Sequence, residues 1–128
     1  MAGLGTTGTF TGVARRLKAH DPGIRVVELQ PESALHGLEG WKDLQTALVP
    51  AIYQPGLADE RRIVATEDAH ALIRTVARRF GLLLSPSAAA NLTGAIQVAR
   101  ELAEGTVVTV FPDNADKYSE VLDHLFNT

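Results

Sequence analysis

Residues 62–81, RIVATEDAHALIRTVARRFG, contain the clearest strand-to-helix transition of the sequence. The first four residues are rich in β-branched side chains, which favours a short strand. Thr66 then offers a helix N-cap, with Glu67 and Asp68 in the first turn, where acidic side chains are favoured. Gly81 is a typical residue to end the helix. Between them lies an apolar stripe at helical spacing, formed by Ala69, Leu72, Ile73, Val76, Ala77 and Phe80. The stretch therefore predicts a strand at 62–65 and a helix at 66–80.

The same alternation of strand and helix continues on both sides of this unit. Further strands are predicted at 24–29, 82–84 and 106–111, the last being the strongest strand signal in the chain. A first helix is indicated by an apolar stripe that ends before 18–23. A third helix is predicted to begin at a Ser87 cap, run to Leu102 and be closed by Gly105. A fourth is predicted around 118–125. The residues of the first stripe are Phe10, Val13, Ala14 and Leu17.

The predicted strands are apolar on both faces, which is typical of a parallel sheet covered by helices on its two sides. We therefore predict an α/β fold, a three-layer αβα arrangement with a mainly parallel sheet, in a single domain over residues 1–128. The stretch 30–60 carries weak signals and is predicted to be a long connection, of a kind that is often functional.

The composition bounds the class of protein. The chain has 128 residues, 12 basic against 15 acidic side chains and a formal net charge of −3. It is 45% hydrophobic and contains no cysteine. This balance predicts a soluble, cytoplasmic, globular protein without a nucleic-acid surface, a membrane segment or a disulfide framework. His20, His36, His70 and His124 lack metal-ligand spacing, so no metal site is predicted.

A glycine-rich stretch near the start is the first functional signal. Residues 3–8, GLGTTG, match the G-x-G-x-x-G pattern, and Glu28 follows 20 residues after Gly8, as in a dinucleotide-binding fold. Only Met1 and Ala2 precede it, so no preceding strand is expected, and the threonines are unusual for such a turn. Glycines and hydroxyls that open a helix are better suited to a compact phosphate monoester. A plain helix N-terminus without a ligand is the remaining interpretation.

Several motifs in order resemble those of the cysteine synthase family, pyridoxal-phosphate-dependent enzymes of fold type II. The resemblance is closest to the cysteine synthase B type and extends over nearly the whole chain. The glycine loop resembles the phosphate loop of that family, and the other stretches resemble a strand ending in Gln-Pro, a Gly-Ile segment with an Ile-Pro turn, a Ser-Ser-Gly helix start and a strand ending in Pro-Asp before Arg-Tyr. The stretches are 5–15, 27–32, 37–52, 81–90 and 108–118.

The resemblance implies a cofactor site. Pyridoxal 5′-phosphate would have its phosphate on the glycine loop and its pyridine nitrogen beside Ser87, where a hydroxyl leaves the nitrogen unprotonated and favours β-elimination and replacement. Gly37 would lie in a segment that closes over an amino-acid substrate. The residues that the resemblance assigns to the cofactor are Gly5, Thr6, Thr7, Gly8, Thr9, Ser87, Pro112 and Asp113.

Two departures from the family pattern qualify this expectation. Ser85 and Ala89 stand where the family has glycine, and Pro86 replaces a small apolar residue, which narrows the expected pocket. The family's Schiff-base lysine lies before the glycine loop, and neither Lys18, Lys42 nor Lys117 matches its motif. The chain is therefore expected to be the C-terminal portion of the family's cofactor domain, without a catalytic lysine and inactive alone.

Three functions follow as hypotheses. The leading one is a cysteine-synthase-like chain that converts an activated serine such as O-acetylserine and a sulfur donor to cysteine, as a homodimer or in association with a lysine-bearing half. The second is a non-catalytic paralogue that binds a phosphate-bearing ligand or a partner. The third is an NAD-binding, Rossmann-like domain that uses Glu28.

Overall fold

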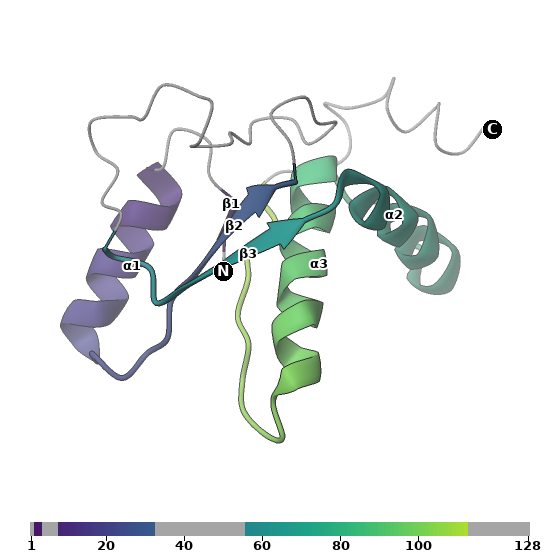
Figure 1. The fold of residues 1–128 in the computed structure, drawn as a ribbon. Helices are drawn as coiled ribbons and strands as arrows, with labels where there is room; N and C mark the ends of the chain where they lie inside the picture. Colours follow the sequence, from purple (N-terminus) through teal and green to yellow (C-terminus); the bar gives the residue numbers. More distant parts are fainter. Residues whose placement is uncertain (1, 4–7, 33–55, 113–128) are drawn as a thin grey trace.

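The computed structural model describes residues 2–3, 8–32 and 56–112 of the chain. Three strands and three helices occur in these ranges, and strand alternates with helix in the first half (Figure 1). In chain order they are β1 (Ala2–Gly3), α1 (Gly8–His20), β2 (Val27–Pro31), β3 (Glu60–Val64), α2 (Thr66–Phe80) and α3 (Pro86–Glu101).

The three strands form one parallel sheet in the order β1-β2-β3. Val27 lies opposite Glu60, and Ala2 lies opposite Glu28. All five residues of the central strand β2 are buried, which is the expected consequence of helices on both faces. The strands predicted at 24–29 and 62–65 are thus confirmed, although their observed bounds are 27–31 and 60–64.

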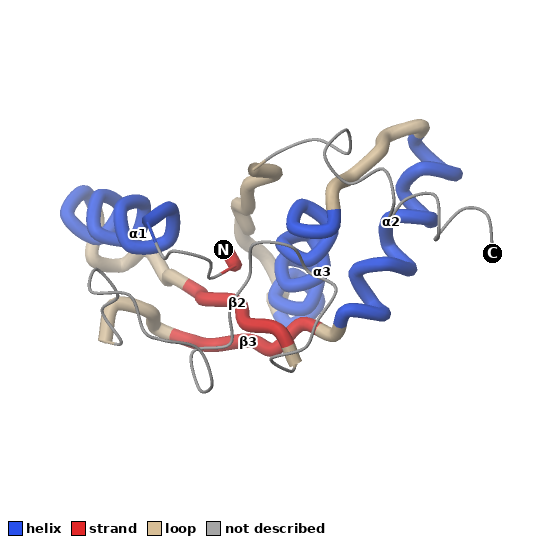
Figure 2. Tube along the Cα trace, turned by 90° about the horizontal axis from the view of Figure 1, so that it is seen from above, coloured by secondary structure: helices blue, strands red, loops and turns tan. Residues whose placement is uncertain are grey.

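The two faces of the sheet are covered by different helices. Figure 1 shows α1 on one side of the strands and α3 on the other, with α2 packed on the outer side of α3; the view in Figure 2 also places α1 and α2 at opposite ends. The larger core cluster joins Leu29 and Val64 to the inner faces of α2 and α3, and a smaller one joins Phe10 and Ala14 of α1 to Val26. The predicted three-layer α/β fold is therefore confirmed.

Helix α3 approaches the sheet unusually closely at Gly94. A Cβ added there would lie 2.5 Å from Cδ2 and 2.6 Å from Cδ1 of Leu29, a side chain with no exposed surface. Such distances are far inside van der Waals contact, so only glycine allows this separation between helix and strand.

Of the two predicted ends of α2, the C-terminal one is confirmed and the N-terminal cap is wrong. Gly81 terminates the helix in the left-handed conformation, at a φ of 66°, and its N–H donates to the carbonyl of Ala77. The predicted cap at Thr66 is wrong: Ala65 is the N-cap and makes no side-chain capping bond, while Thr66 is already the first helical residue. Glu67 and Asp68 in the first turn then supply the negative charge that favours this end.

The strongest strand prediction is also wrong within the described residues. Residues 106–112 form no strand, and of 82–84 only Leu84 makes an isolated bridge. The segment after α3 instead reverses at Gly105, at a φ of 138°, and runs back along the helix (Figure 1). Strand propensity depends on pairing and packing context, and the side chain of Asn91 on α3 binds the carbonyl of Val110 in this segment.

Several predicted inward-facing residues are exposed. On α1, Phe10 and Ala14 are buried, but Val13 is 49% and Leu17 39% exposed. Phe80 is 71% exposed at the end of α2, and Leu102 lies beyond the last residue of α3. The apolar stripes thus located the helices correctly but overestimated how far each is covered. The predicted helix at 118–125 lies outside the described residues.

Within the described ranges, no helix combines the length and apolar character that crossing a membrane requires.

Candidate functional site

The helices α1 and α3 both begin at the upper side of the sheet, toward which β2 and β3 point; α3 begins beside the carboxyl ends of these two strands, and α1 begins farther to the left (Figure 1). In parallel α/β sheets this is the edge where ligands bind. Gly8 and Thr9 form the start of α1 on one face, and Pro86 and Ser87 form the start of α3 on the other. We refer to this end of the sheet as the carboxyl edge.

A strand does precede the glycine loop. Ala2 and Gly3 form β1, paired in parallel with Glu28 and Leu29 of β2. The expectation that no strand would precede the loop is therefore wrong. The order strand, glycine loop, helix is the arrangement that brings helical N–H groups to a bound anion.

The first turn of α3 is organised by Ser85. Its backbone is extended, and its Oγ accepts a hydrogen bond of 3.1 Å from the N–H of Ala88, so Ser85 is the N-cap and Pro86 occupies the first helical position, which proline favours. The prediction of Ser87 as the cap is wrong for this reason. Ser87 is the second helical residue and is only 6% exposed.

The residues that depart from the family pattern are all buried at this helix start. Ser85 and Ala89 have no exposed surface, and Ala89 belongs to the larger core cluster. The hydroxyl of Ser85 is used within the helix, and the methyl of Ala89 packs in the protein interior. The structure therefore gives Ser85 a capping role and Ala89 a packing role.

The segment 106–112 is brought to the same region by Asn91. Its Nδ2 donates a 2.9 Å hydrogen bond to the carbonyl of Val110, and Asn91 is 2% exposed. Since Asn91 follows Ser87 by four positions, the two share one face of α3. Pro112, two residues after Val110, is exposed. The structure thus places two predicted site residues, Ser87 and Pro112, at the start of α3 and at the end of a segment bound to it.

The remaining predicted site residues divide into two groups. Gly8 and Thr9 are described as the first residues of α1. The others lie outside the described residues: Gly5, Thr6, Thr7, Gly37 and Asp113.

The charges at the three helix starts test whether the carboxyl edge suits a phosphate. The first turns of α1 and α3 contain no acidic residue, whereas the first turn of α2 contains Glu67 and Asp68. A carboxylate at a helix start would compete with a bound anion for the positive end of the helix. The starts of α1 and α3 therefore fit a phosphate-bearing cofactor, and the buried Ser87 hydroxyl fits a polar ring atom.

The nucleotide interpretation assigned Glu28 to a ribose, and the structure gives it another role. Glu28, the second residue of β2, is 2% exposed, and its Oε1 accepts hydrogen bonds from Nε of Arg61 at 2.6 Å and from Nε2 of Gln30 at 3.2 Å. Arg61 lies directly opposite Glu28 in the ladder. The carboxylate thus forms an ion pair within the sheet, which does not favour dinucleotide binding.

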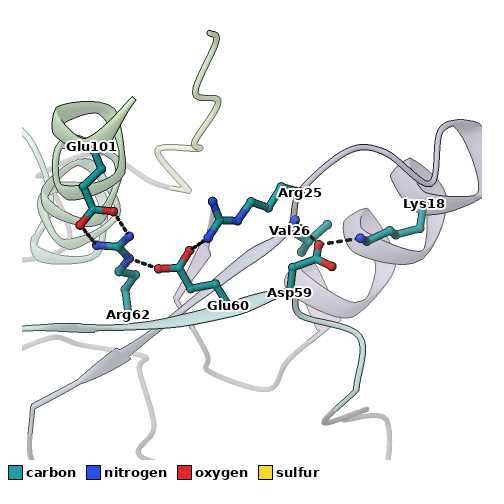
Figure 3. Close-up of polar contacts among 7 residues, drawn as sticks. All are labelled: Lys18, Arg25, Val26, Asp59, Glu60, Arg62 and Glu101. Atoms are coloured by element: carbon teal, nitrogen blue, oxygen red, sulfur yellow. Dashed lines mark hydrogen bonds and ion pairs between the residues drawn. The ribbon is translucent and has the colours of Figure 1, made fainter. Parts of the chain in front are cut away.

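The opposite end of the sheet, the amino edge, carries a chain of ion pairs that sequence patterns did not reveal (Figure 3). Arg62 pairs with both Glu60 and Glu101, and Glu60 also pairs with Arg25. The bond from Arg62 Nη1 to Glu101 Oε1 measures 2.7 Å. This hydrogen bond with Arg62 lowers the pKa of Glu101, and the two acidic partners raise the pKa of Arg62.

A second pair at the amino edge joins α1 to the strands. Lys18 Nζ lies 2.5 Å from Asp59 Oδ2, which also accepts a hydrogen bond from the N–H of Val26 at 2.7 Å. The N–H of Asp59 donates in turn to the carbonyl of Val26 at 2.8 Å. The hydrogen bond from Lys18 is the main cause that lowers the pKa of Asp59, and the hydrogen bond from the N–H of Val26 lowers it further. The chain separation of 41 residues between the two charges explains why no local pattern predicted the pair.

The comparisons with known proteins agree with this geometry. The profile of the family described as pyridoxal-phosphate-dependent enzyme matches residues 1–113. A cysteine synthase of Aquifex aeolicus is 41% identical over 122 residues, which are 92% of this chain and 37% of that protein. Cysteine synthase B of Escherichia coli is 32% identical over 120 residues, which are 92% of this chain and 39% of that protein.

Solved structures show the same fold. An O-ureido-L-serine synthase superposes with a TM-score of 0.84 at 29% identity, over 95% of this chain and 42% of that one. An O-acetylserine-dependent cystathionine β-synthase of Helicobacter pylori gives 0.81 at 34% identity, over 93% and 41% of the two chains. The chain thus spans about two-fifths of the length of the relatives that it matches.

Proposed function

The chain belongs to the family of pyridoxal-phosphate-dependent enzymes, and from this premise we propose that it supplies the cofactor-holding part of a cysteine-synthase-type enzyme. The reaction of the whole protein would replace the leaving group of an activated serine, such as O-acetylserine, with sulfide or another sulfur donor to give cysteine. The observation that carries the proposal is the buried hydroxyl of Ser87 at the start of α3. It stands at the edge of the sheet where α1 also begins without an acidic residue.

The predicted site residues would contact different parts of the cofactor or the substrate. The loop Gly5–Thr9 would bind the phosphate through N–H groups and hydroxyls at the positive end of α1. The hydroxyl of Ser87 would donate to the ring nitrogen and hold it unprotonated, while Pro112 and Asp113 would border the ring. Gly37 would lie in the segment that closes over the substrate. When bound, the cofactor supplies the electron sink for elimination and replacement at the β-carbon of an amino acid.

None of the chain's own lysines is proposed as the Schiff-base residue. Lys18 lies in the last turn of α1 and is bound to Asp59 at the amino edge, the opposite end of the sheet from Ser87. Lys42 and Lys117 lie outside the described residues. We propose that the lysine comes from another part of the whole protein or from an associated polypeptide, in a homodimer or a complex of two halves. The chain alone is therefore expected to be inactive.

The lysine proposal is tested by titrating this chain with pyridoxal 5′-phosphate, reducing with borohydride and mapping the labelled peptides. Weak, scattered labelling is expected, together with no cysteine formation from O-acetylserine and sulfide. Addition of the lysine-bearing N-terminal part of a relative is expected to produce activity. A single stoichiometric adduct on one lysine of this chain would overturn the proposal.

The site proposal needs a probe that cannot form a Schiff base. Pyridoxine 5′-phosphate carries an alcohol in place of the aldehyde, so its affinity reports only the non-covalent site. Ser87→Ala is expected to weaken its binding about tenfold, the effect of one hydrogen bond to a polar ring atom. Thr75→Val is the matched control, because the Thr75 hydroxyl donates to Ala71 within α2. Equal affinity in Ser87→Ala and the unaltered chain would contradict the assigned role of Ser87.

A further inference from the structure

Asn91 is a buried amide in a stretch of α3 otherwise made of small apolar residues. It follows Ala88, Ala89 and Ala90, none of which has exposed surface, and is itself 2% exposed. Asparagine is a poor helix former, and a buried amide is costly unless it is hydrogen-bonded. The bond that Asn91 makes to the carbonyl of Val110, 19 residues later in the chain, offsets that cost.

The segment that Asn91 binds is only partly held by apolar packing. Val107 packs against the larger core cluster. Beyond it, Val108 is 71%, Val110 41% and Phe111 48% exposed. The packing of Val107 therefore holds the start of the segment, and the hydrogen bond from Asn91 joins its far end to α3.

This bond acts at the candidate site. Asn91 and Ser87 lie on one face of α3 because they are four positions apart, and the bound carbonyl is two residues before Pro112. We propose that Asn91 is a positioning residue: its amide holds the segment 106–112 against the face of α3 that carries Ser87, so that Ser87 and the Pro112 end of the segment contact the same cofactor ring. The inference rests on the proposed function, because the cofactor ring is part of that proposal.

The tether itself is tested without any ligand. Hydrogen exchange of the backbone amides of 107–111 is compared in the unaltered chain, in Asn91→Leu, which keeps the volume but removes the donor, and in Gln97→Leu. Gln97 is the matched control, because its amide on the same helix donates to the carbonyl of Ile63 at 3.3 Å, away from the segment. Among the amides of 107–111 that are protected in the unaltered chain, exchange is expected to rise about tenfold in Asn91→Leu alone, with protection in α2 unchanged. Equal exchange in all three chains would overturn the proposal.

A second variant separates hydrogen bonding from simple packing. In Asn91→Asp the introduced carboxyl is a donor only when protonated, and burial beside a carbonyl raises its pKa. After correction for intrinsic rates, 107–111 is expected to exchange faster at pH 8 than at pH 5 in this variant and equally in the unaltered chain. A variant with the same exchange at both pH values would show that the donor is not what holds the segment, and would overturn the proposal.

The link to the cofactor is read from the affinity for pyridoxine 5′-phosphate. Asn91→Leu is expected to weaken binding about fivefold to tenfold, and Gln97→Leu to leave it unchanged. If Ser87→Ala weakened binding while Asn91→Leu did not, the proposed function would stand and the positioning role would fail. If the unaltered chain did not bind the probe at all, the proposed function would fail, and so would the role of Asn91 in positioning the segment against the cofactor ring. Hydrogen exchange would still show whether Asn91 holds the segment 106–112.

Discussion

The two edges of the sheet differ in the kind of side chain that they present. The amino edge is crossed by ion pairs from Lys18 to Asp59 and from Arg25 through Glu60 and Arg62 to Glu101. At the carboxyl edge, α1 begins with Gly8 and Thr9, and α3 begins with Pro86 and Ser87 after the Ser85 cap. The described ion pairs thus join elements at the amino edge, whereas the first turns of α1 and α3 at the carboxyl edge contain no acidic residue.

Helix α2 marks the limit of that rule. It also begins after the carboxyl end of a strand, but its first turn holds the exposed acidic residues Glu67 and Asp68. These satisfy the positive end of α2 from within the chain. The absence of such residues from α1 and α3 is therefore a property of those two helices and not of every helix start.

The largest effect is expected at the close contact between α3 and β2. Gly94→Ala places a methyl against Leu29, and overpacking at this buried contact is expected to cost about 2 kcal/mol of unfolding free energy despite the better helix propensity of alanine. Gly12→Ala is the control, because a Cβ there meets nothing within 4 Å, and it is expected to gain up to about 1 kcal/mol. Urea titrations of the two variants measure the difference. A stabilised Gly94→Ala chain would show that α3 and β2 separate easily.

The carboxyl edge is probed by the cap of α3. Ser85→Ala removes the oxygen that accepts from the N–H of Ala88 and is expected to cost about 1 kcal/mol. Thr66→Ala is expected to change stability little, because the N-cap of α2 is Ala65. Thermal unfolding of both variants compares the two helix starts. A larger loss in Thr66→Ala than in Ser85→Ala would contradict the observed caps.

The amino edge is probed by Arg62→Met, which keeps the apolar stem and removes the charge. Because Arg62 bridges two acidic residues but lies near the surface, the expected loss is about 0.5–1 kcal/mol, smaller in high salt. Affinity for pyridoxine 5′-phosphate is expected to stay the same, since the pair is remote from Ser87. A loss of affinity in a folded Arg62→Met chain would break the division between the two edges.

The smallest effect is the pH dependence of the same edge. The folded pKa values of Asp59 and Glu101 are lowered, so their contribution is fully present above the ordinary pKa of each carboxyl and is lost as pH falls through the lowered values. Stability is expected to decline below about pH 4. The decline is expected to be shallower in a chain with Asp59→Asn and Glu101→Gln. Unfolding curves between pH 6 and pH 2.5 measure both slopes, and identical slopes would show that these carboxyls are not coupled to folding.

Local patterns in the sequence predicted the features that depend on interactions between neighbouring residues. The stripes and the glycine at 81 located α2, because helix periodicity and the left-handed cap are properties of neighbouring residues. The cap at Ser85 was missed in favour of Ser87, although the sequence contains a signal for it: proline favours the first helical position, which makes the residue before Pro86 the N-cap.

Features that join distant residues were not predictable from pattern. Residues 106–111 have the composition of a strand, yet they form none, and the carbonyl of Val110 instead accepts a hydrogen bond from Asn91 on α3. The burial of Glu28 depends on Arg61, which is 33 residues away. At the candidate site, the family resemblance supplied the residues, and the structure added the cap at Ser85 and the hydrogen bond from Asn91 to Val110.

The register of β2 with β3 has a consequence for the order of folding. Each pairing in that ladder joins residues 33 positions apart, as between Glu28 and Arg61. The chain loses conformational entropy when this loop closes, before the hydrogen bonds of the ladder can form. Helices α2 and α3 are adjacent in the chain and pack on one another, so their contact closes a much shorter span. We expect the helical pair to form early and the parallel ladder late, which makes the completed sheet, and with it the carboxyl edge, the slow step of folding.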